Sequence, residues 1–379
     1  MDAFFTSSTI FVRPSIKQVA QLAGVSISTV SRLLNTPGAV SAQTAEKIHR
    51  SIAQLGFRPN FTGRNLRSGH SRTVGVVLPA LTDAVFAHCL QGIELAAREL
   101  GYAVLFATTG CQPDAESAVV EMLIGHRVDG MILTVADAAA NACLDVLERE
   151  GIPFVLAGSS PAAPQAGVPS CTRTSVSIDN RAAARDAVRH LLQLGHRRIR
   201  MLSGRFEAAD HHIRRHEGYL DAMREAGLDP LPVIQVASHT PTLVACRQMM
   251  AAVDGGEPHP TALFCASDWL AMCVMRDLNT LGLRVPEDMS VMGIDGLPVG
   301  ELMQPALSSV AQPFGRIGDV ALRALVEALE CGATAPTGMH RVLPHVVRAG
   351  GTTAAPGSPE RPASDPGQAQ TSSSIGASS

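Results

Sequence analysis

Between residues 74 and 294 the chain alternates short apolar runs with longer segments of helical periodicity. Helical patterns such as Phe86–Leu100, Ala115–Gly125 and Ala138–Glu150 separate the first runs. Runs that are apolar along their whole length are typical of parallel strands covered by helices on both faces. The stretch is too long for one such sheet, so we expect an α/β body of two lobes. The expected strands are Val74–Leu78, Ala103–Ala107, Gly130–Thr134, Phe154–Ala157, Ile199–Leu202, Val233–Val236, Ala262–Cys265 and Val291–Ile294.

The segment ahead of this body has the pattern of three short helices. Ser15 begins a capping box with the glutamine three residues later, and Gly24 supplies the left-handed residue that ends a first helix. Ser26 is a suitable N-cap for a second helix, and Ser41 for a third that ends at Gly56. A turn of about three residues between the first two helices is typical of a helix-turn-helix, so we expect an all-α headpiece of this type.

The charge distribution supports nucleic-acid binding by the headpiece. The whole chain carries a net charge of −3, yet the segment Ser15–Arg72 holds eight basic residues and one acid. That segment is therefore +7 and the remainder −10. A basic module on an acidic body is typical of a nucleic-acid binder, although a solvated basic surface has the same composition. RNA binding is disfavoured because the module lacks aromatic side chains on which bases stack.

Other features narrow the class of protein. The eight cysteines are scattered without a C-x-x-C pair, which favours reduced thiols in a cytoplasmic protein. The first 14 residues lack the basic start and long apolar stretch of a signal peptide, and no apolar run is long enough to span a membrane. There is no G-x-G-x-x-G after the first expected strand, no P-loop and no nucleophile elbow, so we expect neither an enzyme nor a cofactor.

The string from Ser15 to Asn35, SIKQVAQLAGVSISTVSRLLN, resembles the headpiece signature of the lactose/galactose repressor (LacI/GalR) family. Its core, V-A-x-x-A-G-V-S-x-x-T-V-S-R, is highly specific. The resemblance extends over about Ser15 to Arg348. Later landmarks that resemble the family are Leu55–Asn60, Arg127–Gly130, Gly195–Arg197, Gly282–Pro286 and Gly293–Asp295.

The resemblance implies a domain order. It gives an N-terminal extension (1–14), the helix-turn-helix (15–59), a hinge helix and linker (60–72), and an effector-binding and dimerisation domain (73–349). The last has two Rossmann-like lobes, as in periplasmic binding proteins, with the chain crossing near residues 178, 312 and 341. From residue 350 to 379 Pro, Ser, Gly, Ala and Thr dominate, which predicts a disordered tail.

The resemblance also implies a function. It indicates a transcriptional regulator that binds a palindromic operator as a homodimer, most often a repressor of carbohydrate or sugar-acid metabolism genes. A small-molecule effector bound between the lobes would control it. The alternative is a cytoplasmic solute-binding protein with the same two-lobed fold, but such a protein has no use for the headpiece.

The second helix of a helix-turn-helix lies in the major groove, with its first residues at the base edges. We therefore expect Ile27 and Ser28 to face bases and Arg32 to donate two hydrogen bonds to a guanine. Thr29 and Ser31 are placed for phosphates, which position the protein without reading sequence.

The stretch after the third helix matches the family's hinge helix, which forms on the operator. In the family a leucine of this helix wedges into the minor groove, where it unstacks a base step. Gly63 lies inside this expected helix and costs about 1 kcal/mol relative to alanine, so the hinge is harder to fold. The implied DNA contacts are Asn60, Arg64, Leu66 and Arg67, and Leu66 is the wedge leucine.

The resemblance places the effector pocket in the interlobe cleft. Asp295 and Arg215 align with family pocket positions and are the strongest candidates; Asp268 and Asp179 come next. The resemblance further implies that Phe86 and Trp269 give the pocket apolar faces and that His239 lies where an aromatic wall is usual.

The loop Leu78–Phe86 resembles that of gluconate-type regulators, which suggests a sugar acid held by two hydrogen bonds from Arg215. A metal site at His212 and His216, four residues apart on one helix face, is the alternative for that segment. It lacks a third ligand, so we expect no metal.

Overall fold

The computed structural model describes residues 14–58, 70–110, 112–135, 141–159, 173–206, 210–236, 242–254, 259–332 and 338–357. The chain divides into two compact units, Met1–Ser71 and Arg72–Ser379. Each unit is described by itself below, as a headpiece and a body. Among the described residues, no helix combines the length and apolar character that crossing a membrane requires.

The headpiece contains the predicted helix-turn-helix. Helix α1 (Ile16–Ala23) and helix α2 (Ile27–Asn35) are followed by the 3₁₀ turn η1 (Pro37–Ala39) and helix α3 (Ala42–Leu55). The capping box at Ser15 is present, and the glycines after α1 and α3 adopt the left-handed conformation that ends each helix. The small core that the helices share consists of Val19, Ala20, Val30, Leu33, Ile48 and Phe57.

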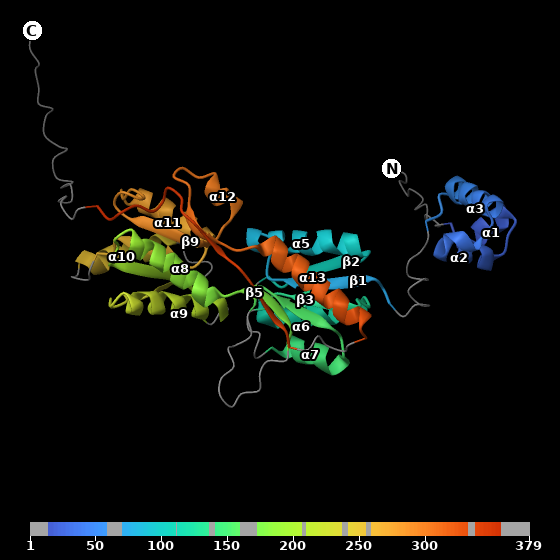
Figure 1. The fold of residues 1–379 in the computed structure, drawn as a ribbon, viewed down its shortest axis with the longest axis horizontal. Helices are drawn as coiled ribbons and strands as arrows, with labels where there is room; N and C mark the ends of the chain where they lie inside the picture. Colours follow the sequence, from blue (N-terminus) through green and yellow to red (C-terminus); the bar gives the residue numbers. More distant parts are fainter. Residues whose placement is uncertain are drawn as a thin grey trace, which may run out of the picture. The chain divides into compact units, whose positions relative to one another are not determined.

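The first lobe of the body is built on a six-stranded parallel sheet of order β11-β5-β4-β3-β1-β2. Helices α5 and α13 pack against each other over one face of the sheet, and α6 and α7 cover the other (Figure 1). The strands are β1 (Thr73–Leu78), β2 (Ala103–Thr108), β3 (Gly130–Leu133), β4 (Phe154–Ala157), β5 (Ser175–Ile178) and β11 (His340–Leu343). The helices are α5 (Ala84–Leu100), α6 (Pro113–Gly125), α7 (Ala142–Glu150) and α13 (Phe314–Glu330).

The second lobe repeats this plan, with strand order β12-β10-β9-β8-β6-β7 and only the edge strand β12 antiparallel. Helices α8 and α9 pack together on one face, and α10 and α11 on the other. The strands are β6 (Ile199–Gly204), β7 (Ile234–Val236), β8 (Ala262–Cys265), β9 (Ser290–Asp295), β10 (Ser308–Ala311) and β12 (Val346–Arg348). The helices are α8 (Asn180–Gln193), α9 (Asp210–Glu225), α10 (Thr242–Asp254), α11 (Asp268–Thr280) and α12 (Pro298–Glu301).

Within the described residues the chain passes between the two sheets at three places. It runs from β5 into α8, from β10 into α13, and from β11 to β12 (Figure 1). Each lobe therefore takes one edge strand, β11 or β12, from the C-terminal part of the described chain. These connections join the lobes close to the carboxyl ends of β5 and β10, where open α/β sheets bind ligands.

The expectation of a disordered tail from Gly350 onward is wrong for residues 350–357. Thr352 is fully buried: its hydroxyl donates to the Val291 carbonyl at 2.7 Å and accepts from the Ser308 amide at 2.8 Å. The Ala354 amide donates to the hydroxyl of Ser290 at 3.1 Å. Composition missed this segment because it is held by hydrogen bonds to the first residues of the inner strands β9 and β10, which small polar residues make well.

Candidate functional site

The first residues of α2 are arranged around its N-cap. The Ser26 hydroxyl accepts a hydrogen bond from the Thr29 amide at 3.1 Å. The same oxygen lies 2.7 Å from the Ser28 hydroxyl and 2.8 Å from the Thr29 hydroxyl. Val30 and Leu33 anchor the other face of the helix in the headpiece core. The cap thus fixes where α2 begins, and the core fixes which side of it faces outward.

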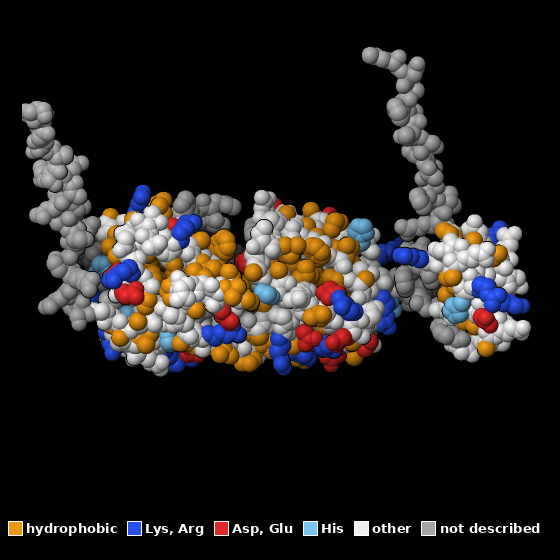
Figure 2. Space-filling view, turned by 90° about the horizontal axis from the view of Figure 1, so that it is seen from above, with side chains coloured by type: hydrophobic (Ala, Val, Ile, Leu, Met, Phe, Trp, Pro, Cys, Tyr) orange, Lys and Arg blue, Asp and Glu red, His pale blue; other side chains and the backbone are white. Residues whose placement is uncertain are grey.

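The outward side of α2 carries the predicted base-reading residues. Ile27 is 47% exposed, and Ser28 and Arg32 are exposed as well. Thr29 and Ser31 are half-buried. Figure 2 shows Lys and Arg side chains on the visible face of the headpiece beside an acidic group. The predicted hinge contacts Asn60, Arg64, Leu66 and Arg67 lie outside the described residues and stay predictions.

In the body, three of the predicted effector residues come together at the carboxyl ends of β8 and β9. Asp295 is the last residue of β9, Asp268 is the first residue of α11, and Arg215 lies on α9. All three are buried, with 5% of Arg215, 0% of Asp268 and 6% of Asp295 exposed. A nitrogen of the Arg215 guanidinium is 3.6 Å from Asp295 Oδ1, and the Asp268 amide donates to Asp295 Oδ2 at 3.2 Å.

Three residues that the sequence did not suggest complete this cluster. Arg215 Nε donates to Asn180 Oδ1 at 2.9 Å, and Gln312 Nε2 donates to Asp295 Oδ1 at 2.9 Å. The Ser309 hydroxyl donates to Asp268 Oδ1 at 2.5 Å. Asn180 and Gln312 lie at two of the three passages between the lobes. The signal that could have found them is this position, because a polar residue beside a predicted crossing lies near the cleft.

The backbone of Asp295 is strained. Its φ of 146° lies in a region that glycine tolerates and other residues disfavour, at a cost of about 1–3 kcal/mol. Asp268 holds the turn that follows, because its Oδ2 accepts from the Leu297 amide at 2.8 Å. A Cβ atom at Gly293 would overlap the Asp268 carboxylate, so this approach requires glycine. Such strain is typical of functional sites, where the surrounding bonds maintain it.

Burial dominates the electrostatics of the cluster. Burial outweighs the lowering effect of Arg215 and, together with the charges of Asp268 and Asp83, raises the pKa of Asp295 to about 8. Burial also raises the pKa of Asp268, while its hydrogen bonds lower it. Near neutral pH, Asp295 therefore keeps a proton in much of the population.

Two histidines at the start of α9 stay uncharged beside this cluster. Burial, and then the charge of Arg215, lowers the pKa of His212 to about 4 and that of His211 well below its ordinary value. His212 Nδ1 is 3.4 Å from the Ser203 hydroxyl, whereas His216 stacks on Phe206 with 4.8 Å between ring centroids. Among the described residues, no group of three acidic, histidine or cysteine side chains is placed to hold a metal ion.

The remaining effector candidates occupy other environments. Asp179 is exposed and caps α8, where its Oδ1 accepts from the Ala182 amide at 2.9 Å. Trp269 is 67% exposed on α11. Phe86 lies in the first turn of α5 and packs in part against the core of the body. His239 lies outside the described residues.

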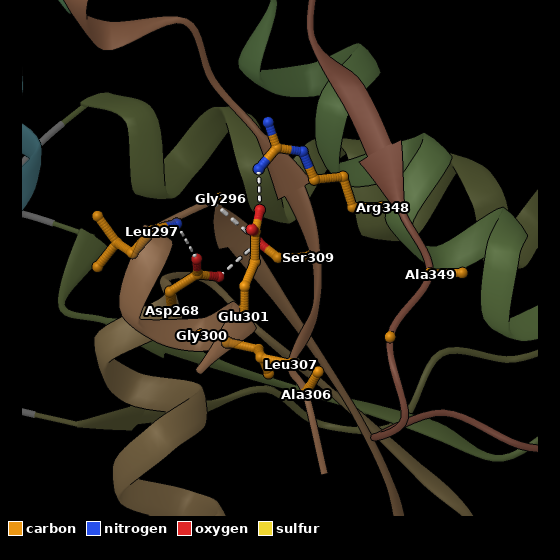
Figure 3. Close-up of a pocket in the computed structure, with 11 residues that line it drawn as sticks. Asp268, Gly296, Leu297, Gly300, Glu301, Ala306, Leu307, Ser309, Arg348 and Ala349 are labelled. Carbon is orange, nitrogen blue, oxygen red and sulfur yellow. Dashed lines mark hydrogen bonds and ion pairs between the residues drawn. The ribbon is translucent and has the colours of Figure 1, made fainter. Parts of the chain in front are cut away.

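A cavity of about 370 Å³ borders the cluster on the side of α12 and β10. Asp268 and Ser309 line it, and the hydrogen bond between them is visible in Figure 3. The ion pair of Glu301 with Arg348, 2.6 Å long, lies in its lining. Arg215 and Asp295 do not line this cavity, so of the three buried charged residues Asp268 alone borders it.

Comparison with known proteins decides the family. The family profile of bacterial regulatory proteins, lacI family, matches residues 15–60, and that of a periplasmic binding protein-like domain matches residues 188–353. The HTH-type transcriptional repressor CytR of Escherichia coli (strain K12) is 33% identical over 316 residues, which is 83% of this chain and 90% of that protein. The chain belongs to the LacI family of transcriptional regulators.

Other members of the LacI family support this assignment. The HTH-type transcriptional regulator GntR of E. coli (strain K12) is 33% identical over 328 residues, covering 86% of this chain and 94% of that protein. The crystal structure of the Lac repressor dimer bound to operator and the anti-inducer ONPF matches with a TM-score of 0.77 and 26% identity. It covers 90% of this chain and 100% of that chain. The predicted family and fold class are confirmed: the headpiece is the DNA-binding domain of a regulator and the body is its effector-binding part.

Proposed function

We propose that this LacI-family chain is a homodimeric repressor of carbohydrate metabolism genes, and that an effector bound at the Arg215–Asp295–Asp268 cluster controls its affinity for a palindromic operator. The observation that carries the proposal is the position of this buried polar cluster. It lies in the second lobe at the carboxyl ends of two parallel strands, yet the charge of Asp83, from the first lobe, acts on both Arg215 and Asp295. A ligand held there would contact Arg215 and Asp295, on which charges from both lobes act.

The passages between the lobes give this site a route to the rest of the molecule. Asn180 follows β5 and Gln312 follows β10, and each is hydrogen-bonded to a member of the cluster. A rotation of one lobe against the other bends the chain at these two passages, directly beside Arg215 and Asp295. An effector that binds one lobe arrangement better than the other shifts the population toward it.

The proposed DNA contacts follow from the geometry of α2. Ile27 and Ser28 contact bases, Arg32 reads a guanine, and Thr29 and Ser31 bind phosphates. Two headpieces of a dimer read two half-sites related by the operator's symmetry. The hinge residues supply the minor-groove contacts, with Leu66 as the wedge and Asn60, Arg64 and Arg67 beside it.

The test uses Asp295→Ala in the full chain, with operator binding measured by fluorescence anisotropy on a palindrome selected from a randomised library. We expect operator affinity to be kept and the response to effector to be lost, because coupling between two sites in such proteins is typically about 1–3 kcal/mol and requires a bound effector. Asp229→Ala, an exposed acid in the same lobe, is the matched control. An Asp295→Ala protein that releases operator at the wild-type effector concentration contradicts the site.

A further inference from the structure

The cavity beside α12 runs from a buried end to an exposed end. Asp268 and Ser309 line the buried end and are hydrogen-bonded to each other. At the exposed end, 63% of the Glu301 side chain and 51% of the Arg348 side chain are accessible, and the two point toward each other (Figure 3). The volume of about 370 Å³ is near the lower limit of ligand pockets, about 300–1,000 Å³, so the space suits a small compound.

Between these two ends the lining of the cavity is apolar. Leu297 and Leu307, both buried, line it together with Ala306 and the backbone of Gly296 and Gly300. Burial of an aliphatic group against such a surface is favourable, whereas a charged group there would lose its hydration without gaining a partner. The middle of the cavity therefore favours an aliphatic group.

The ion pair at the exposed end can open easily. One terminal nitrogen of Arg348 donates to Glu301 Oε1 at 2.6 Å, and among the described residues Glu301 alone is hydrogen-bonded to this guanidinium. The guanidinium carries further N–H donors, so Nε and the second terminal nitrogen stay available as an adjacent pair. An ion pair between exposed side chains contributes little to stability, because solvent weakens it and both side chains lose freedom in it. Each member can therefore exchange its partner for a charged group of a ligand.

The two charges together favour a ligand that carries both signs. A simple carboxylate would bind Arg348 but face the negative charge of Glu301, and a simple amine would bind Glu301 but face Arg348. An α-amino acid avoids both repulsions, since its carboxylate can accept two parallel hydrogen bonds from Arg348 while its ammonium group donates to Glu301. Its side chain can then enter the cavity between Leu297 and Leu307.

We propose that this cavity is a second ligand site, apart from the effector cluster, which binds a small aliphatic α-amino acid at Glu301 and Arg348. Arg215 and Asp295 do not line the cavity, so an occupant leaves the cluster free for an effector. The occupant borders Asp268, whose amide donates to Asp295 Oδ2 at 3.2 Å. The second site thus adjoins the effector cluster through one residue.

The experiment titrates the full chain by calorimetry with L-leucine and with analogues that each lack one of its features. Leucinamide lacks the carboxylate, 4-methylpentanoate lacks the ammonium group, and L-alanine lacks most of the aliphatic side chain. We expect L-leucine to bind and each analogue to bind at least about tenfold more weakly, because each loses a charge-assisted hydrogen bond or buried apolar surface. An analogue that binds as tightly as L-leucine overturns the proposal, and so does L-leucine that fails to bind at millimolar concentration.

Two substitutions test whether L-leucine binds at the ion pair. Arg348→Met keeps the apolar stem without the charge, and should weaken L-leucine at least about tenfold but strengthen leucinamide, because the repulsion of its ammonium group is gone. Glu301→Gln should likewise weaken L-leucine and strengthen 4-methylpentanoate. Arg284→Met, which breaks the exposed ion pair of Arg284 with Asp288 in the same lobe, is the control and leaves these affinities unchanged. An L-leucine affinity that is the same in the wild type, Arg348→Met and Glu301→Gln places the amino acid elsewhere and overturns the proposal.

Discussion

The face of α2 proposed to read DNA and the cluster proposed to bind the effector are built in opposite ways. On α2 the proposed base-reading side chains point outward, with Ile27 47% exposed, and the cap and packing of the helix set their direction. In the body, Asp268 is fully buried and each polar group is held by hydrogen bonds to its neighbours. Changes on the first surface should therefore act locally on recognition, whereas changes in the second should spread into stability and ligand response.

The largest expected effect separates the two regions by salt. The segment Ser15–Arg72, of charge +7, should bind DNA mainly through phosphates, so operator affinity should fall about 1,000-fold between 50 and 200 mM salt. Binding of an effector to the buried cluster of the body should change much less over the same range, because salt screens buried groups less. Both are measured on the full chain, by anisotropy and calorimetry. An equal salt dependence of operator binding and effector binding would contradict this difference between the two regions.

The next effect is on stability. Asp268→Ala removes the acceptor of the Leu297 amide and of the Ser309 hydroxyl, and leaves both donors buried without it. We expect the body to lose about 3 kcal/mol of unfolding free energy in urea denaturation. Asp229→Ala should change it by less than about 0.5 kcal/mol. A loss below about 1 kcal/mol for Asp268→Ala would show that the cluster is not a connected network.

Arg32→Ala should leave stability unchanged and reduce operator preference. Loss of a two-bond guanine contact costs about 1–3 kcal/mol of discrimination, measured as the affinity ratio of operator to random DNA. Lys47→Ala, on the exposed side of α3, is the comparison, because we expect Lys47 to contact a phosphate. The loss of a phosphate contact weakens binding to all DNA sequences alike. If Arg32→Ala lowers binding to operator and random DNA equally, α2 does not read bases through this residue.

The last expected effect is a dependence of stability on pH. The pKa of Asp295 is about 8 in the folded protein and near 3.8 in an unfolded chain. Between these values only the unfolded chain releases the proton, so stability falls as pH rises and levels off above pH 8. The slope cannot exceed about 1.4 kcal/mol per pH unit and should be absent in Asp295→Asn. Thermal unfolding of both proteins from pH 5 to 9 measures it; parallel curves would refute it.

How far the sequence predicts this fold depends on the kind of strand. Most of the apolar runs became inner strands, where burial on both faces demands apolar side chains, whereas β2 and β7 are partly exposed edge strands. Strands β5 and β10 were not recognised from their pattern, since Ser175, Ser177 and Ser308 interrupt the apolar character although each is fully buried. Their hydroxyls make hydrogen bonds within the folded protein: that of Ser175 lies 2.6 Å from Nδ1 of His340 in β11. Hydropathy cannot anticipate a partner that lies far along the chain.

The candidate site shows the same limit. Family resemblance nominated Arg215, Asp268 and Asp295, and the structure brings these three together. The resemblance did not indicate Asn180, which accepts a hydrogen bond from Arg215 at a separation of 35 residues. Patterns in a single sequence carry no information on which side chains come together at a site. Asp179, which the resemblance also indicated, caps α8, and its contact with an effector stays a prediction.

The use of residues 340–357 by both lobes has a consequence for how the protein is made. Strand β11 completes the first sheet, strand β12 completes the second, and Thr352 is inserted beneath β10 and β9. During synthesis the headpiece emerges whole and folds early, since domains fold as units from the amino terminus. Neither lobe is complete until nearly the entire chain has left the ribosome. A chain that stops before residue 340 therefore lacks a strand of each sheet, and we expect it to keep a folded headpiece without a body able to respond to effector.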